Sequence, residues 1–244
     1  MIKFLIFDLD GTLYEKKSVV LRYLQEFADI EKYNFDEIYQ IFTNSYILAK
    51  KETFPSPTSF WSRVHDIFMN SIKSSKMDLL DKLVEEAKQN VLLEIKPRKN
   101  TTKLLRKAKE SGIKIIVFTG SNDMYDSINF NESKEEILEL KKFKLKQLEI
   151  LGLLSYIDRL ILTSEYGGYK PQKLVFEKLL EDLKAQPEEC LMIGDTYNDL
   201  GATQLGIFSI MIGDNDTKNF TPNLRIEEFK DIIDIIDFEK CSLK

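Results

Sequence analysis

The sequence predicts an α/β fold, a three-layer Rossmann-like core on a parallel sheet with an all-α helical-bundle cap domain inserted after the first strand. Three observations predict it. Short apolar runs of strand length alternate with helical patterns over the C-terminal part of the chain. Residues 15–93 show helical patterns alone. Most of the apolar runs end in polar residues suited to a single site.

Residues 2–7 form the first predicted strand, which is apolar except at Lys3. Such a run is typical of a strand that is covered on both faces. Asp8 and Asp10 follow it directly. Because residues two apart in an extended chain point to the same side, both carboxylates are expected at the carboxyl end of this strand. Gly11 then suits a sharp exit from the strand.

Residues 15–93 are predicted to form the cap, since four amphipathic patterns follow one another there without a strand signal. The catalytic core is then predicted to comprise residues 1–14 and 94–244. We interpret Trp61 as packing between cap helices and His65 as an ordinary helix-surface residue. If the cap covers the crevice, its inward-facing residues would contribute to substrate specificity. Further candidates for this role are Tyr14, Lys50, Lys51 and Arg63, and we assign none of them to the site.

The remaining strands are predicted over residues 113–119, 159–164, 190–195 and 208–213. Helices are predicted between them over 97–112, 133–151 and 171–184, with a short one ending at Gly206. Strands and helices that alternate in this way form right-handed crossovers, and hence a parallel sheet with helices on both faces. We interpret the charged run 132–146 as a solvated helix face. The connection over 122–142 is long, and we favour plain surface over a lid or an oligomer contact.

Composition excludes several classes of protein. The chain has 244 residues, 43% of them hydrophobic, and a formal net charge of −5, which argues against a nucleic-acid partner held by overall charge. The absence of a membrane-length apolar run or a signal-peptide pattern predicts no membrane partner and a cytoplasmic location. Cys190 and Cys241 lack metal-ligand spacing. We expect a monomer or a homodimer.

Polar residues follow four of the predicted strands. Because the carboxyl ends of parallel strands share one edge of the sheet, these residues can converge on a single crevice. In strand order they are Asp8 and Asp10, then Thr119 and Gly120, then Lys170, and finally Asp195 and Asp199.

The chemistry of this set favours phosphoryl transfer. Carboxylates such as Asp8, Asp10, Asp195 and Asp199 supply the hard oxygen ligands that Mg²⁺ prefers. A lysine and a threonine hydroxyl suit a phosphate dianion. Positioning and charge neutralisation supply most of the catalysis in phosphoryl transfer, and a carboxylate can act as the nucleophile. No P-loop motif is present in the sequence.

Four motifs in order resemble those of the haloacid dehalogenase-like hydrolases. They are Asp8-Leu-Asp10-Gly11-Thr12, the strand-end Thr119, Lys170-Pro171, and Gly194-Asp195-Thr196 with Asp199. The helical insert resembles the small helical cap of that superfamily. One departure is that Gly120 and Ser121 follow Thr119 where many relatives have asparagine.

The resemblance implies a role for each motif residue. Asp8 would attack phosphorus and Asp10 would act as the acid and base, with its backbone carbonyl on the metal. Thr119 and Gly120 would hold phosphoryl oxygens, while Lys170 would neutralise Asp8 and phosphate. Asp195 would bind Mg²⁺ directly, with Asp8 as a further ligand, and Asp199 would complete the acidic cluster or fix a bound water.

The function expected from these roles is Mg²⁺-dependent hydrolysis of a small phosphorylated metabolite through an aspartyl-phosphate. The substrate would be a sugar phosphate, a nucleoside monophosphate or a phosphorylated acid. A phosphomutase of the same superfamily would use the same residues. A phospho-accepting signalling module also combines Asp, Thr and Lys around Mg²⁺, but its acceptor lies on a later strand and it has no inserted helical domain.

Overall fold

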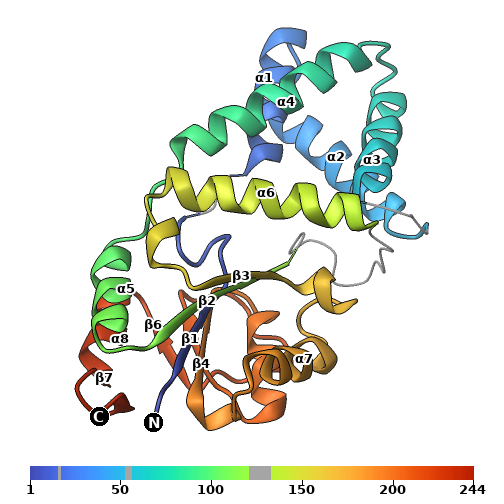
Figure 1. Ribbon diagram of the computed structural model, residues 1–244. Helices are drawn as coiled ribbons and strands as arrows, with labels where there is room; N and C mark the ends of the chain where they lie inside the picture. Colours follow the sequence, from blue (N-terminus) through green and yellow to red (C-terminus); the bar gives the residue numbers. More distant parts are fainter. Residues whose placement is uncertain (16–17, 53–56, 121–132) are drawn as a thin grey trace. The chain divides into compact units, whose positions relative to one another are not determined.

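The computed structural model describes residues 1–15, 18–52, 57–120 and 133–244 (Figure 1). Within these residues the chain divides into two compact units. One unit holds residues 1–15, 95–120 and 134–244. The second unit holds residues 18–52 and 57–94, with Ser133.

The first unit is built on a six-stranded parallel sheet, in the order β3-β2-β1-β4-β5-β6, which confirms the predicted fold class (Figure 1). The strands are β1 (Phe4–Phe7), β2 (Lys114–Thr119), β3 (Arg159–Leu162), β4 (Cys190–Gly194), β5 (Phe208–Ile212) and β6 (Leu224–Ile226). A separate antiparallel pair follows, β7 (Ile236–Asp237) with β8 (Ser242–Leu243). Strands β1 to β5 were predicted from the sequence, whereas β6, which is only three residues long, was not.

Helices cover both faces of this sheet. On one face, Phe229 of α8 (Phe229–Ile235) meets Phe7 of β1 edge to face, and α5 (Thr101–Glu110) packs beside α8. On the other face, α7 (Lys173–Leu183) and the 3₁₀ helix η4 (Asp199–Leu205) bury an apolar cluster that includes Phe176 and Ala202. Helix α6 (Lys134–Ile150) contacts β3 at the edge of the sheet.

Three shorter 3₁₀ helices lie in the loops of this unit: η1 (Leu154–Tyr156), η2 (Thr163–Tyr166) and η3 (Pro187–Glu189). The predicted start of α5 is wrong. The helix begins at Thr101 rather than at Pro97, because Asn100 takes a left-handed conformation with φ of 67° immediately before it. Pro97 instead forms an isolated bridge with Tyr14.

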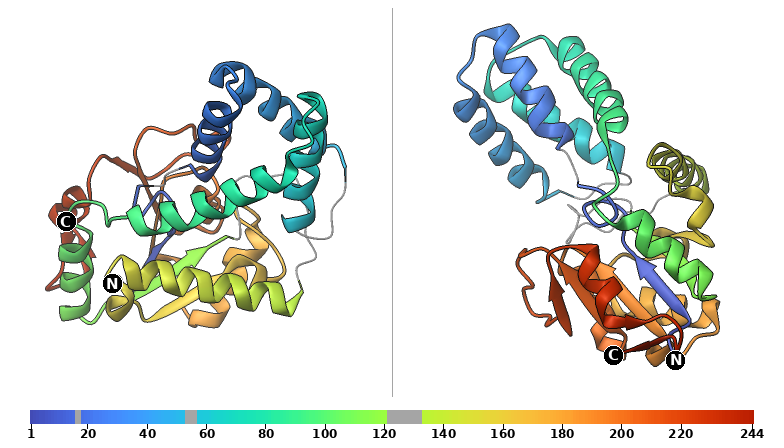
Figure 2. Two further views of the ribbon diagram at one scale, coloured as in Figure 1. Left: turned by 90° about the horizontal axis from the view of Figure 1, so that it is seen from above. Right: turned by 90° about the vertical axis from the view of Figure 1, so that its left-hand side faces the viewer.

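The second unit consists of the helices α1 (Val19–Glu31), α2 (Phe35–Ala49), α3 (Pro57–Ser71) and α4 (Met77–Glu94) (Figure 2). Helix α1 packs on α4 and α2 packs on α3. Their apolar stripes meet in one core that includes Phe27, Phe42 and Phe68. The side chains of Ser18 and Asn34 cap α1 and α2, because each accepts a hydrogen bond from a backbone N–H group in the first turn of its helix. Such N–H groups have no partner within the helix itself.

The sequence-based interpretation of His65 as a helix-surface residue is wrong. His65 is buried, with 8% of its surface exposed, rather than lying on a helix surface. Its Nε2 and the hydroxyl of Tyr23 share a hydrogen bond of 3.1 Å. Trp61 stacks on Phe42 and lies against the same core, as predicted. The aromatic surroundings explain why an isolated histidine in the sequence can be a core residue.

Candidate active site

Lys170 connects three strand ends of the first unit. Its ammonium lies 2.7 Å from Oδ1 of Asp8, 2.5 Å from Oδ1 of Asp199 and 3.1 Å from the carbonyl oxygen of Phe118. Lys170, Asp8 and Asp199 are all at least nine-tenths buried. A buried ammonium needs such partners, because desolvation of an unpaired charge is costly. The residues predicted at the ends of β1, β3 and β4 therefore meet at one point.

Three carboxylates form an acidic cluster at this site. Asp8, Asp195 and Asp199 each offer an oxygen atom, and these atoms lie within 4.8 Å of one another. Thr12 donates a hydrogen bond of 2.8 Å to Oδ1 of Asp195. The backbone N–H and the hydroxyl of Thr196 both donate to Oδ2 of Asp199, at 3.2 and 3.1 Å. A cluster of hard oxygen donors, each oriented by a neighbour, fits a divalent metal ion.

Two glycines make this arrangement possible. A Cβ atom on Gly11, whose φ is +89°, would lie 2.3 Å from Oδ2 of Asp195. A Cβ atom on Gly194 would lie 2.1 Å from Cγ of Asp199. Carboxylates can approach the backbone this closely only where the side chain is absent. Arg98 donates two hydrogen bonds to the carbonyl of Gly11 and fixes this turn.

The carboxylate of Asp10 has a different set of partners from that of Asp8. The hydroxyl of Tyr14 donates to its Oδ1, and the ammonium of Lys144 contacts its Oδ2. Gln147 donates to Oδ1 of Asp10 at 3.4 Å and to the hydroxyl of Tyr14 at 3.0 Å. Burial, and then the charge of Asp10, raise the pKa of Tyr14 well above its usual 10, so Tyr14 stays a proton donor.

The residues predicted to contact phosphate lie at the end of β2. Thr119 is the last residue of this strand and is buried, and Gly120 follows it with partial exposure. The carbonyl that Lys170 contacts belongs to Phe118, the residue immediately before Thr119. The sheet therefore brings the β2 end to the strand ends that carry Asp8 and Lys170. The roles of Thr119 and Gly120 in phosphate binding stay predictions.

Lys144 and Gln147 were not predicted from the sequence. The interpretation of the charged run 132–146 as a solvated helix face is wrong at Lys144, because only 6% of this side chain is exposed. The signal in the sequence was the spacing of Lys144, Gln147 and Leu148, which places them on one face of α6. Residues 122–132 of the long connection over 122–142 lie outside the described residues.

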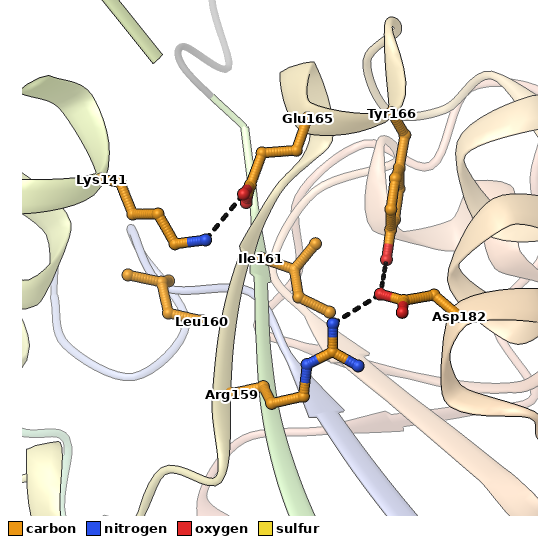
Figure 3. Close-up of a pocket in the computed structure, with 7 residues that line it drawn as sticks. All are labelled: Lys141, Arg159, Leu160, Ile161, Glu165, Tyr166 and Asp182. Atoms are coloured by element: carbon orange, nitrogen blue, oxygen red, sulfur yellow. Dashed lines mark hydrogen bonds and ion pairs between the residues drawn. The ribbon is translucent and has the colours of Figure 1, made fainter. Parts of the chain in front are cut away.

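A separate pocket of about 290 Å³ opens beside β3 (Figure 3). It is lined by Lys141, Arg159, Leu160, Ile161, Glu165, Tyr166 and Asp182. Lys141 pairs with Glu165 at 2.7 Å, and Arg159 and Tyr166 each contact Oδ2 of Asp182 at 2.6 Å. Because these charged groups already neutralise one another across the pocket, we assign no ligand to it.

Comparison with known proteins identifies the family. The family model described as "haloacid dehalogenase-like hydrolase" matches residues 2–204. The chain belongs to the haloacid dehalogenase-like hydrolases. The sequence resemblance is thereby confirmed, and the protein is an enzyme of the hydrolase class. In the described part of the chain, no helix combines the length and apolar character needed to cross a membrane.

Individual relatives of this hydrolase are distant. The chain is 22% identical to the glyceraldehyde 3-phosphate phosphatase of Methanothermobacter thermautotrophicus, over 89% of this chain and 88% of the relative. It is 24% identical to the pyrophosphatase PpaX of Oceanobacillus iheyensis, over 96% and 97% of the two chains. The solved structure of a HAD phosphatase from Thermococcus onnurineus superimposes with a TM-score of 0.59 at 19% identity, covering 98% of this chain and 99% of the other. This last likeness shows the fold.

Proposed function

We propose that this hydrolase is a Mg²⁺-dependent phosphatase of small phosphorylated metabolites, with Asp8 as its nucleophile. The observation that carries the proposal is the contact of one buried ammonium, Lys170, with both Asp8 and Asp199, beside the carboxylate of Asp195. A nucleophilic carboxylate, a fixed positive charge and a site for a divalent cation are the parts that phosphoryl transfer requires. The distant relatives named as phosphatases support the same reaction class.

In the proposed first step, a carboxylate oxygen of Asp8 attacks phosphorus and the bond to the leaving oxygen breaks. Asp10 gives a proton to that leaving oxygen. Lys170 holds Asp8 in place and neutralises the negative charge that gathers between the carboxylate and the phosphoryl group. The product of this step is an aspartyl-phosphate on Asp8, together with the free alcohol.

In the second step, water attacks the phosphorus of the aspartyl-phosphate. Asp10 takes the proton from this water, so that one residue serves as acid and then as base. The bond between phosphorus and the Asp8 oxygen breaks, inorganic phosphate leaves, and the carboxylate of Asp8 is restored. Thr119 and Gly120, at the end of β2, are proposed to hold the phosphoryl oxygens throughout.

The ligands proposed for Mg²⁺ are the carboxylates of Asp8, Asp195 and Asp199 with the backbone carbonyl of Asp10. When bound, the ion supplies positive charge against the phosphoryl oxygens. Thr12 and Thr196 orient two of these carboxylates through their hydrogen bonds. We further propose that residues 15–93 form a cap domain on a core of residues 1–14 and 94–244.

The test is a screen for phosphate release with and without Mg²⁺. The substrates are sugar phosphates, nucleoside monophosphates, phosphorylated acids and pyrophosphate. Release of inorganic phosphate from at least one of them, dependent on Mg²⁺ and lost in Asp8→Asn, is the expected result. Isomerised sugar phosphate without phosphate release would instead identify a mutase. A lasting phosphoprotein without turnover would identify a signalling module.

A further inference from the structure

Lys144 differs from the other lysines of helix α6. Lys142 and Lys146, two positions before and after it, have side chains that are 60% and 59% exposed. The side chain of Lys144 is 6% exposed and forms an ion pair with Asp10, whose side chain is 12% exposed. One lysine of a lysine-rich helix is therefore directed into the candidate active site.

Helix α6 reaches Asp10 through two residues, Lys144 and Gln147. Lys144 forms an ion pair with Oδ2 of Asp10. Gln147 donates to Oδ1 of Asp10 and also to the hydroxyl of Tyr14, which itself donates to the same Oδ1. Lys144 and Gln147 are three residues apart and share one helix face. Both oxygens of the Asp10 carboxylate are thus held by donors that belong to the first unit.

Stability alone does not account for this buried ion pair. The desolvation of two charges often equals or exceeds their attraction, so that an apolar pair of similar volume would serve the fold as well or better. A helix of this composition could also turn Lys144 toward solvent, as it does Lys142 and Lys146. The buried pair is explained if it holds a reactive carboxylate in one orientation.

We propose that Lys144, assisted by Gln147, is a positioning residue that fixes the Asp10 carboxylate for proton transfer. This inference rests on the proposed function, in which Asp10 protonates the leaving oxygen. Proton transfer requires an oxygen of Asp10 within hydrogen-bond reach of that leaving oxygen. A reactive group displaced by about 1 Å can lose on the order of 100-fold in rate. The orienting groups come from α6 and Tyr14, which belong to the same unit as Asp10.

The experiment compares Lys144→Met with Lys142→Met, which removes a charge from the exposed side of the same helix. Single-turnover formation of the aspartyl-phosphate is measured with an alkyl phosphate and with p-nitrophenyl phosphate, whose leaving group needs little protonation. We expect Lys144→Met to lose about 10- to 100-fold with the alkyl phosphate and less than about threefold with p-nitrophenyl phosphate. Lys142→Met should match the unaltered protein with both substrates.

A double-mutant cycle separates positioning from a purely structural effect. In the Asp10→Asn background, Lys144→Met should add less than about threefold, because it acts through a carboxylate that is no longer present. Equal losses with the two substrates, or losses that multiply with those of Asp10→Asn, would overturn the inference. Gln147→Leu, which keeps Lys144, should give a smaller loss with the same dependence on the leaving group.

The outcome also separates this inference from the proposed function. If the unaltered protein releases no phosphate from any tested substrate, the proposed function fails. If it releases phosphate and Lys144→Met behaves as Lys142→Met does, the proposed function stands and only the role of Lys144 is wrong. A thermal unfolding scan of each variant, with Lys144→Arg as the charge-preserving change, shows whether a lost rate follows from lost folding.

Discussion

The ammonium of Lys170 lies 2.7 Å from the carboxylate of Asp8, although the two residues are 162 positions apart in the chain. Asp8 follows β1 and Lys170 lies in the loop after β3, so their contact depends on the order of strands in the sheet. Because the same ammonium also contacts Asp199, it neutralises two buried carboxylates at once.

Asp8→Asn should abolish turnover and leave the fold intact. The amide is close in shape to the carboxylate but does not supply the nucleophilic oxygen. The measurement is phosphate release, with circular dichroism to confirm folding. Asp234→Asn, which changes an exposed aspartate on α8, is the matched control. Turnover that persists in Asp8→Asn would indicate attack by water in place of the aspartate.

Lys170→Met should reduce the rate by about 30- to 1,000-fold, which corresponds to about 2–4 kcal/mol of transition-state stabilisation. It should also lower the free energy of unfolding, because Asp8 and Asp199 would lose a buried partner. The measurements are kcat/KM and urea unfolding. Lys173→Met, which alters an exposed lysine at the start of α7, should change neither. A loss under twofold would show that Lys170 takes no part in catalysis.

Gly11→Ala should weaken the response to Mg²⁺ as well as the fold. The new Cβ would lie 2.3 Å from Oδ2 of Asp195 and must displace that carboxylate. Gly112→Ala is the control. Gly112 also has a positive φ, of +75°, but a Cβ added there would meet no atom of the described residues within 4 Å, apart from its chain neighbours. Both variants should lose about 1–2 kcal/mol of stability from backbone strain. Only Gly11→Ala should require more Mg²⁺ for half-maximal activity, and equal requirements would contradict this account.

Chelation with EDTA should remove the activity, and added Mg²⁺ should restore it, because the clustered carboxylates would otherwise repel one another and the substrate.

Thr12→Val should raise the Mg²⁺ concentration needed for half-maximal activity by about 10- to 100-fold, through loss of the hydrogen bond to Asp195. Thr102→Val, at an exposed position of α5, provides the comparison. An unchanged Mg²⁺ requirement in Thr12→Val would show that Thr12 does not orient Asp195 for metal binding.

His65 should make the helical unit sensitive to acid. Burial lowers the pKa of His65 from 6.5 to about 4, so the folded protein holds this side chain neutral. Between these pH values the unfolded chain binds the extra proton, and the free energy of unfolding therefore falls as the pH falls from 6.5 toward 4. The full loss from this group is about 3 kcal/mol. Thermal unfolding across this range should show a shallower pH dependence in His65→Gln, and identical slopes would contradict the prediction.

Local patterns in the sequence were sufficient for most of the fold. The apolar runs at β1, β2, β3, β4 and β5 are long enough to distinguish buried strands from their surroundings. Strand β6 was missed because its three residues, Leu224–Ile226, include Arg225 and show no periodicity. The start of α5 was misplaced because the left-handed conformation of Asn100 has no sequence signal as strong as that of Pro97.

The sequence by itself determined the strand-end residues, since Asp8, Lys170 and Asp195 each follow an apolar run whose end must lie at one edge of a parallel sheet. Only the tertiary structure decided which residues surround Asp10. Lys144 and Gln147 reach it from α6, where a lysine among lysines looks like solvated surface. The physical reason is that sequence periodicity shows only which face of a helix is apolar. The burial of the Lys144 ammonium depends instead on its ion-pair partner, Asp10, which lies 134 residues away in the chain.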